Sequence, residues 1–326
     1  MSTVARADQA TPAGSARALS ERRPLGDRGF QVLALACGLL VLVILVLIAV
    51  STTQQASSWF TTEGLKIFAR TWDPATGQFG ALSFIYGTAV TAIIALVMAV
   101  PVSIGIALLL TEVVPYRWSR PIVYVIDLLA VVPSVVWGLW GILVFAPWIG
   151  KIYSDIGSAV NGVPVLGALF GPPTSGASFF TAGVILAFMI TPIVTSLSRE
   201  VIATVPAIDK EGAYALGATR LEMIRGAVWP HSKGGIVGAV LLGLGRAMGE
   251  TIAAALVIGS SATITSHLFA PGDSMPAVIA NEFGEASGVF RAALMGLGVL
   301  LFIITIIINM IARGIVQRSA RRQRGA

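Results

Sequence analysis

The stretch EGAYALGATRLEMIRGAVWP, from Glu211 to Pro230, lies between two long apolar runs of this 326-residue chain. It is polar and its composition is compatible with a helix. A charged helical segment held between two membrane spans has nothing apolar to bury, so we expect it to dock another protein. The chain shows no glycine-rich nucleotide motif of its own. We therefore expect that the protein docking on this segment supplies energy.

Composition places the whole chain in a membrane. Hydrophobic residues make up 56% of the sequence and charged residues only 12%, which is more apolar than a soluble core of this size could hide. The only cysteine, Cys37, lies in an apolar run. No Cys/His cluster indicates a metal site, and we expect neither a metal nor a cofactor.

The apolar runs predict an all-α, polytopic membrane protein with six transmembrane helices. About 20 apolar residues cross a hydrocarbon layer of roughly 30 Å. The six candidates are Phe30–Val50, then about Ala81–Thr111, Pro121–Ala146, Phe179–Leu197, Gly234–Gly259 and Val289–Ala312. Residues 1–29 are expected to form a disordered cytoplasmic tail, residues 30–316 the transmembrane domain, and residues 317–326 a basic cytoplasmic tail.

Cationic residues set the predicted orientation, because Lys and Arg resist translocation. With the N-terminus inside, 17 of the 22 Lys and Arg residues fall in cytoplasmic segments. These are Arg6, Arg17, Arg22, Arg23, Arg28, Arg117, Arg120, Arg199, Lys210, Arg220, Arg225, Lys233, Arg313, Arg318, Arg321, Arg322 and Arg324. Both termini are therefore expected in the cytoplasm, and the net charge of +6 does not call for nucleic acid.

Two charges fall near the middle of the fifth predicted span. Arg246 and Glu250 are four residues apart, which places them on one face of a continuous helix. One interpretation is a buried ion pair that locks two helices together. The other is a polar patch on a solute path, with Thr251 beside it, where the Arg fork would bind the oxygens of a tetrahedral anion.

Other intramembrane polar and proline residues have structural interpretations. Asp127, near the inner end of the third span, is expected to make a helix-end or inter-helix hydrogen bond rather than to bind solute. Pro101, Pro133 and Pro192 are expected to bend the second, third and fourth spans, because proline frees a backbone carbonyl.

The spacing Glu211, Gly217 and Pro230 resembles the cytoplasmic loop of the inner-membrane permeases of binding-protein-dependent ABC importers. The family pattern is E-A-A, three residues, G, nine residues, I-x-L-P, and this chain departs from it at Gly212, Ala227 and Trp229. In that family the loop forms a short coupling helix in a groove of the ATPase. The resemblance therefore implies a type I importer bundle with a coupling helix at about residues 207–226, called the docking segment below. It implies ATPase contacts at Glu211, Gly212, Ala213, Gly217 and Arg220.

Two further runs, GLGRAMGET at 243–251 and VPSVVWGLWG at 132–141, resemble the PstC-type phosphate permeases. This resemblance implies a bacterial inner-membrane subunit of an ATP-driven phosphate importer. Its implied partners are a PstA-like permease, a PstB-like ATPase dimer, a PstS-like phosphate-binding protein, inorganic phosphate and membrane lipid. It also implies that Arg246 and Glu250 line the path.

Alternative functions remain open from the sequence. Another oxyanion fits the same chemistry, and an ion-coupled secondary transporter would also carry charges in the membrane. An enzyme is not expected, because His231 and His267 fall on opposite sides of the membrane in the predicted topology.

Overall fold

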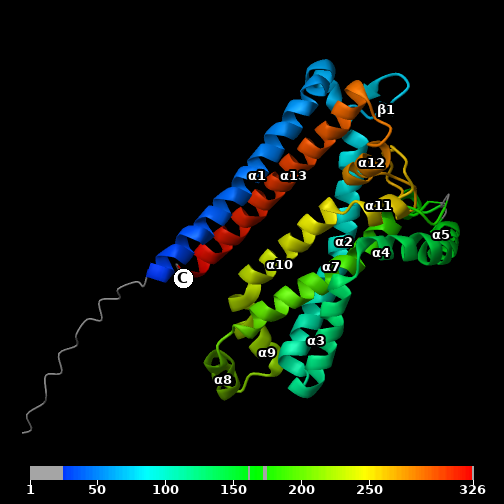
Figure 1. Cartoon of the computed structure of the whole chain (residues 1–326). Helices are drawn as coiled ribbons and strands as arrows, with labels where there is room; N and C mark the ends of the chain where they lie inside the picture. Colours follow the sequence, from blue (N-terminus) through cyan, green and yellow to red (C-terminus); the bar gives the residue numbers. More distant parts are fainter. Residues whose placement is uncertain (1–24, 161, 172–174, 325–326) are drawn as a thin grey trace, which may run out of the picture. The chain divides into compact units, whose positions relative to one another are not determined.

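The computed structural model describes residues 25–160, 162–171 and 175–324, and these ranges are mostly helical (Figure 1). Two short strands among them, β1 (Trp72–Asp73) and β2 (Gln78–Phe79), form an antiparallel pair. The predicted all-α class is confirmed. Residues 1–24 of the expected disordered tail lie outside the described residues, whereas residues 25–29 already belong to the first helix.

The described part of the chain divides into two units, with the boundary between Val50 and Ser51. The described part of the first unit is the beginning of helix α1 (Leu25–Glu63). From Val32 to Val50 this helix is apolar on every face. A helix that is apolar all round is typical of a membrane span, and this one is long enough to cross.

The core of the second unit forms where α7 (Phe179–Ala203) packs against both α2 (Leu82–Leu108) and α10 (Trp229–Gly249). Small residues let these helices approach closely. A Cβ added to Gly183 of α7 would lie 2.5 Å from Ile94 of α2, and one added to Gly243 of α10 would lie 2.6 Å from Val194 of α7. Helix α7 is therefore largely enclosed by its neighbours, and most residues in its apolar part are buried.

Five helical segments of the described chain are long and apolar enough to cross a membrane. They are Gly29–Phe68, Leu82–Val113, Ser134–Val160, Phe179–Ala203 and Gly288–Gly314. Four of them overlap the predicted first, second, fourth and sixth spans. The remaining segment, Ser134–Val160, and helix α10 lie where the third and fifth spans were predicted. In both regions the structure has a break where the prediction had one continuous helix.

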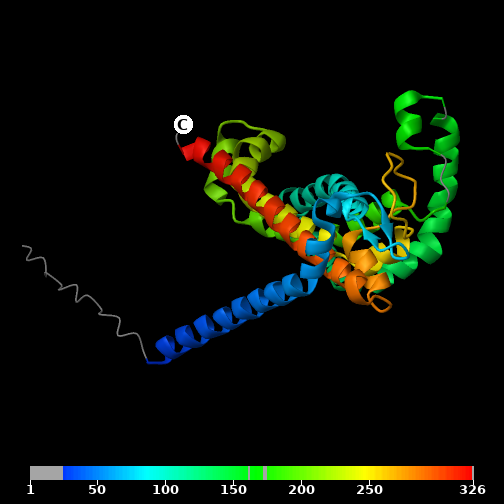
Figure 2. The same ribbon diagram turned by 90° about the horizontal axis from the view of Figure 1, so that it is seen from above.

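The third predicted span, Pro121–Ala146, is not one continuous helix. Helix α3 (Tyr116–Val131) ends before Pro133, and Val132 has an extended ψ of 125°. A proline disfavours the helical conformation of the residue before it and lacks the N–H that a helix interior requires. The chain restarts as α4 (Ser134–Trp140), the π-helical turn η3 (Gly141–Phe145) and α5 (Ala146–Val160), which the short α6 (Pro164–Leu169) follows. Figure 2 shows α5 and α6, in green, set apart from the α2–α7–α10 core.

The fifth predicted span, Gly234–Gly259, is also interrupted. Helix α10 ends at Gly249, Glu250 is extended with a ψ of 125°, and the short α11 (Ile252–Val257) begins after Thr251. The last span belongs to α13 (Gly288–Arg324), which continues well past the predicted boundary at residue 316. The expected basic tail is therefore helical up to Arg324.

Two smaller hydrophobic clusters lie at opposite ends of α2 in the second unit. One joins the end of α1, the 3-10 turn η1 (Gly64–Phe68), the β1–β2 pair, α12 (Met275–Glu282) and α13. Its centre is the fully buried Trp59, whose Nε1 donates to the carbonyl of Phe79 at 3.0 Å. The other lies at the opposite end of α2 and α7. It includes residues of α9 (Arg220–Met223) and of the π-helical turn η4 (Ile224–Val228).

Candidate functional site

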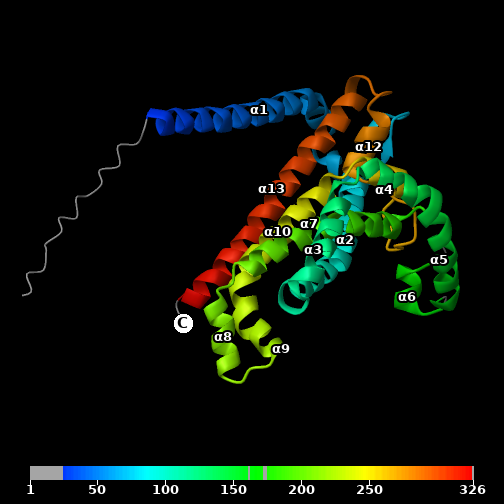
Figure 3. The ribbon, with the colours of Figure 1, turned by 60° about the horizontal axis from the view of Figure 1, so that its bottom comes forward.

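The docking segment is two helices rather than one. Helix α8 (Ala207–Ala215) ends at a turn in which Gly217 has a φ of +80°, and α9 begins after Thr219. A left-handed φ is a conformation that glycine adopts without steric cost. Thr219 and Glu222 form a reciprocal capping box that starts α9. The prediction of a single helix over about 207–226 is thus wrong, because these local signals break it near Gly217 (Figure 3).

Of the five residues predicted to contact an ATPase, Glu211, Gly212 and Ala213 lie in α8, Gly217 lies in the turn and Arg220 opens α9. The structure therefore brings all five into one helix–turn–helix. The described helix α8 has no fully buried residue.

The docking segment also exposes apolar side chains that the sequence analysis did not single out. Leu216 is 91% exposed, Ile208 75% and Leu221 56%. Exposed apolar residues grouped on one segment are typical of an interaction surface. Their signal in the sequence was visible, since each is a large apolar residue inside a polar stretch.

A hydrophobic cluster holds the second half of this helix–turn–helix against the membrane helices. Met223 and Val228, at the end of α9 and in η4, are 2% and 1% exposed. They pack with Ala107 of α2, Ile202 of α7 and Ile236 of α10. Movement of α9 would therefore be passed directly to three long helices.

A cavity of about 850 Å³ lies between α7, α10 and α13. Gly234, Gly238 and Gly245 line it from α10, and the absence of side chains at these three positions leaves space there. Three charged residues, one from each helix, also line the cavity: Glu200 of α7, Arg246 of α10 and Arg313 of α13. A mainly apolar cavity that a few charged side chains line is a candidate solute site.

Arg246 and Glu250 do not share a helical face, contrary to the prediction. Arg246 lies in the last turn of α10, with an exposed side chain, whereas Glu250 lies beyond the end of that helix. The Glu250 Oε1 accepts a hydrogen bond from the backbone N–H of Ala253 at 3.4 Å, and the Thr251 hydroxyl donates to the carbonyl of Gly249 at 3.2 Å. Both side chains make their hydrogen bonds at the break between α10 and α11.

The predicted alternative of an Arg246–Glu250 ion pair is wrong in this conformation. Among the described residues the single ion pair within 4.0 Å joins Lys210 to Glu112. The Arg246 guanidinium therefore lines the cavity without a carboxylate in contact. In that state its planar fork is available for a bidentate contact with an oxyanion.

Asp127 makes the inter-helix hydrogen bond expected of it. The Ser196 hydroxyl of α7 donates to Asp127 Oδ1 of α3 at 3.1 Å. No group of three or more His, Cys, Asp or Glu side chains suited to a metal occurs among the residues that the structure describes.

Residues 75–325 match the model of the family described as binding-protein-dependent transport system inner membrane component. The chain is 42% identical over 325 residues to the phosphate transport system permease protein PstC of Xylella fastidiosa strain Temecula1, covering 99% of each chain. It is 42% identical over 315 residues to PstC of Mesorhizobium japonicum, covering 95% of this chain and 96% of that one. It is 38% identical over 296 residues to PstC 2 of Mycobacterium tuberculosis, covering 89% and 91%.

Solved structures of ABC transporters share the fold. An inward-facing form of the MetNI methionine ABC transporter matches with a TM-score of 0.50 at 16% identity, covering 74% of this chain and 94% of that one. A bacterial ABC transporter for import of the polysaccharide alginate matches with a TM-score of 0.50 at 15% identity, covering 89% and 99%.

Proposed function

The chain belongs to the family of binding-protein-dependent transport system inner membrane components, and from this membership we propose that it is the transmembrane permease subunit of an ATP-driven phosphate importer. The chain is a transport component and not an enzyme; ATP hydrolysis takes place in a partner ATPase. The observation that carries the proposal is an unpaired guanidinium, Arg246, lining a cavity within a permease bundle.

Phosphate suits this cavity chemically. A guanidinium fork matches two oxygens of a tetrahedral anion and can bind them through two parallel hydrogen bonds. Glu200 lines the same cavity and moderates the positive potential, which favours release as well as binding. Glu250 and Thr251, at the adjacent helix break, are proposed to border the path beside Arg246 rather than to pair with it.

The docking segment is proposed to couple this path to the ATPase. Glu211, Gly212, Ala213, Gly217 and Arg220 would contact the ATPase together with the exposed Ile208, Leu216 and Leu221. Because α9 and η4 pack under three membrane helices, ATP-driven movement of the partner would shift those helices together.

The proposed assembly has four kinds of partner. A second, PstA-like permease would complete the path along the interface of two bundles, and a PstB-like ATPase dimer would engage the docking segments. A PstS-like protein would deliver inorganic phosphate from outside. The multi-pass chain would lie in the bacterial inner membrane with both termini cytoplasmic, an orientation that the distribution of Lys and Arg supports.

The experiment that tests this function is phosphate uptake by the complete complex reconstituted in proteoliposomes. We expect uptake to require ATP and the binding protein. Arg246→Ala should lower uptake about tenfold to a hundredfold, the value of a lost charge-assisted contact, while the complex still assembles. Arg70→Ala, at an exposed position outside the apolar spans, is the matched control and should leave uptake unchanged.

Other outcomes would point elsewhere. Loss of assembly in Arg246→Ala would favour a structural role for the guanidinium. Uptake of sulfate in place of phosphate would identify a different oxyanion permease. Uptake driven by an ion gradient without ATP would support a secondary transporter.

A further inference from the structure

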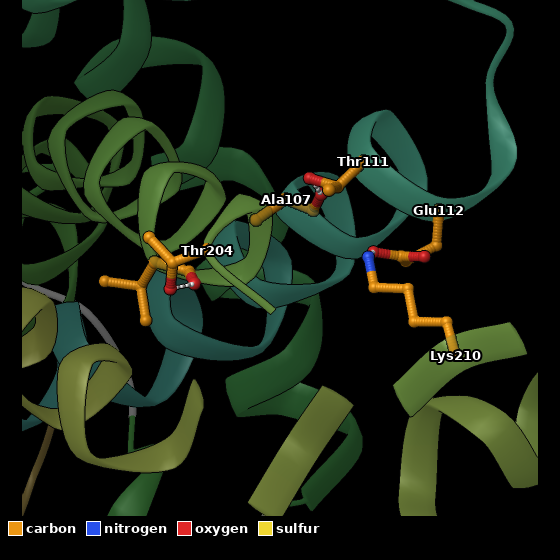
Figure 4. A network of polar contacts seen from close by, with 6 residues as sticks. Ala107, Thr111, Glu112, Thr204 and Lys210 are labelled. Carbon is orange, nitrogen blue, oxygen red and sulfur yellow. Dashed lines mark hydrogen bonds and ion pairs between the residues drawn. The ribbon is translucent and has the colours of Figure 1, made fainter. Parts of the chain in front are cut away.

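One partly buried ion pair ties the docking segment to the end of α2. Lys210 Nζ of α8 contacts Glu112 Oε1 at 2.5 Å, and Figure 4 shows the lysine reaching across to that carboxylate. The Glu112 side chain is 6% exposed and that of Lys210 21%. Glu112 belongs to η2 (Leu109–Val113), the π-helical turn that directly continues α2. In this partly buried position the two charges attract each other more than they would on an open surface.

Helix α8 has few other attachments to the membrane bundle. None of its residues is fully buried, and Ala213 is its one residue packed, only in part, against the inner hydrophobic cluster. Its remaining connections are its contacts with α9 and η4 and two chain segments, residues 204–206 toward α7 and residues 216–219 toward α9. Among the residues that the structure describes, the Lys210–Glu112 contact is the ion pair that joins α8 to the end of α2.

Two side-chain hydrogen bonds to backbone carbonyls lie beside Glu112. Within η2 and its approach, the Thr111 hydroxyl donates to the carbonyl of Ala107 at 2.8 Å, and the Ser119 hydroxyl donates to the carbonyl of Leu110 at 3.1 Å (Figure 4 shows the first of these). Helix α2 in turn packs closely along α7, because Gly183 of α7 lies so near Ile94 of α2 that a larger residue would not fit at position 183. A displacement of Glu112 would therefore be carried into the α2–α7 pair rather than absorbed locally.

We propose that the Lys210–Glu112 ion pair is a transmission link of the transporter, which carries movement of the ATPase-docking helix α8 to α2 and stays closed through the transport cycle. Both residues are positioning residues, because neither is placed on the solute path. The inference rests on the proposed function and adds a second route to the one through α9 and α10. Without the link, α8 would follow the ATPase while α2 lagged behind, and hydrolysis would continue with less transport.

A charge swap in the reconstituted complex tests the link. Lys210→Glu and Glu112→Lys should each lower phosphate taken up per ATP hydrolysed by about tenfold, because each leaves two like charges together. The double variant Lys210→Glu/Glu112→Lys should recover most of the ratio. Arg117→Glu, an exposed charge reversal close to Glu112 in the chain, is the matched control and should keep the wild-type ratio. Unchanged coupling in the single variants, or no recovery in the double variant, would overturn the proposal.

Cross-linking separates transmission from simple stabilisation. In a Cys37→Ser background, Lys210→Cys/Glu112→Cys removes the ion pair and should couple poorly until a short bis-maleimide joins the two thiols. We expect linking to restore uptake. Uptake that stays low after linking would show that the two positions must separate, and this would overturn the link even if the charge variants fail to assemble. If the wild-type complex transports phosphate and the linked variant does not, this inference alone is contradicted. A wild-type complex that moves no phosphate contradicts the proposed function.

Discussion

Gly87 of α2 illustrates how single residues set the packing of this bundle. A Cβ added there would lie 1.8 Å from the backbone oxygen of Asp273 and 3.1 Å from the Phe179 ring. Because a backbone oxygen cannot rotate away, Gly87→Ala should destabilise the protein by about 1–3 kcal/mol, as overpacking usually does. The measurement is thermal unfolding in detergent. Gly105→Ala is the control in the same helix, where nothing lies within 4 Å, and it should stabilise by roughly 0.5–1 kcal/mol through helix propensity. Equal effects of the two variants would contradict the packing argument.

Asp273 lies between α11 and α12, outside the apolar spans, and its side chain is 6% exposed. Burial raises the pKa of Asp273 from 3.8 to about 7; a hydrogen bond from the Ser274 N–H lowers this pKa and the charge of Glu282 raises it. The folded state therefore keeps a proton that the unfolded chain loses near pH 4. The resulting penalty grows from about pH 4 to about pH 7 and is constant above that.

Asp273→Asn should remove this penalty while it keeps an acceptor for the Ser274 N–H. At pH 8 we expect a gain in stability of at most about 4 kcal/mol, since one pKa unit corresponds to 1.36 kcal/mol. Near pH 4 the variant and the wild type should unfold alike. Thermal unfolding at pH 4.5, 6 and 8 provides the check, with the exposed Asp155→Asn as control. A gain that is independent of pH would show that charge burial is not its cause.

At the scale of elements, the turn between α8 and α9 fixes the shape of the docking segment. Gly217→Ala would force an L side chain into a φ of +80°, at a cost of about 1–2 kcal/mol, so the two helices should reorient. We expect the variant to lose ATPase during purification of the complex and to transport less phosphate per ATP. Gly226→Ala, in η4 with open space around it, should behave as wild type. Wild-type coupling in Gly217→Ala would mean that the ATPase tolerates a different turn.

Two helices of this chain, α3 and α10, end at specific residues that interrupt the helix and not at the end of the predicted span. Pro133 divides one apolar run into α3 and α4, and Glu250 with Thr251 divides another into α10 and α11. Apolar character is continuous across the first break, which is why the run indicated a single span. The second break moved Glu250 off the face of Arg246 and changed the predicted site.

For the whole molecule, the distribution of Lys and Arg predicts which end faces the cytoplasm. Leu65, in η1, and Leu216, in the docking segment, are both 91% exposed and form a matched pair. In a Cys37→Ser background, an impermeant maleimide should label Leu65→Cys only from outside the cell and Leu216→Cys only in inverted membrane vesicles from which the ATPase has been stripped. Labelling of Leu216→Cys in intact cells would reverse the topology and place the docking segment out of reach of any cytoplasmic ATPase.

The amino-acid sequence by itself determined the class of this protein, the approximate positions of most of its spans and the location of the polar segment proposed to dock the ATPase. These follow from properties carried by neighbouring residues: apolar runs long enough for a bilayer, a polar stretch between them, and the spacing of Glu211, Gly217 and Pro230. The tertiary structure alone decided which groups meet. It left Arg246 without Glu250, and it paired Lys210 with Glu112, 98 residues apart. Such contacts depend on how helices end and pack against distant partners, which local patterns do not record.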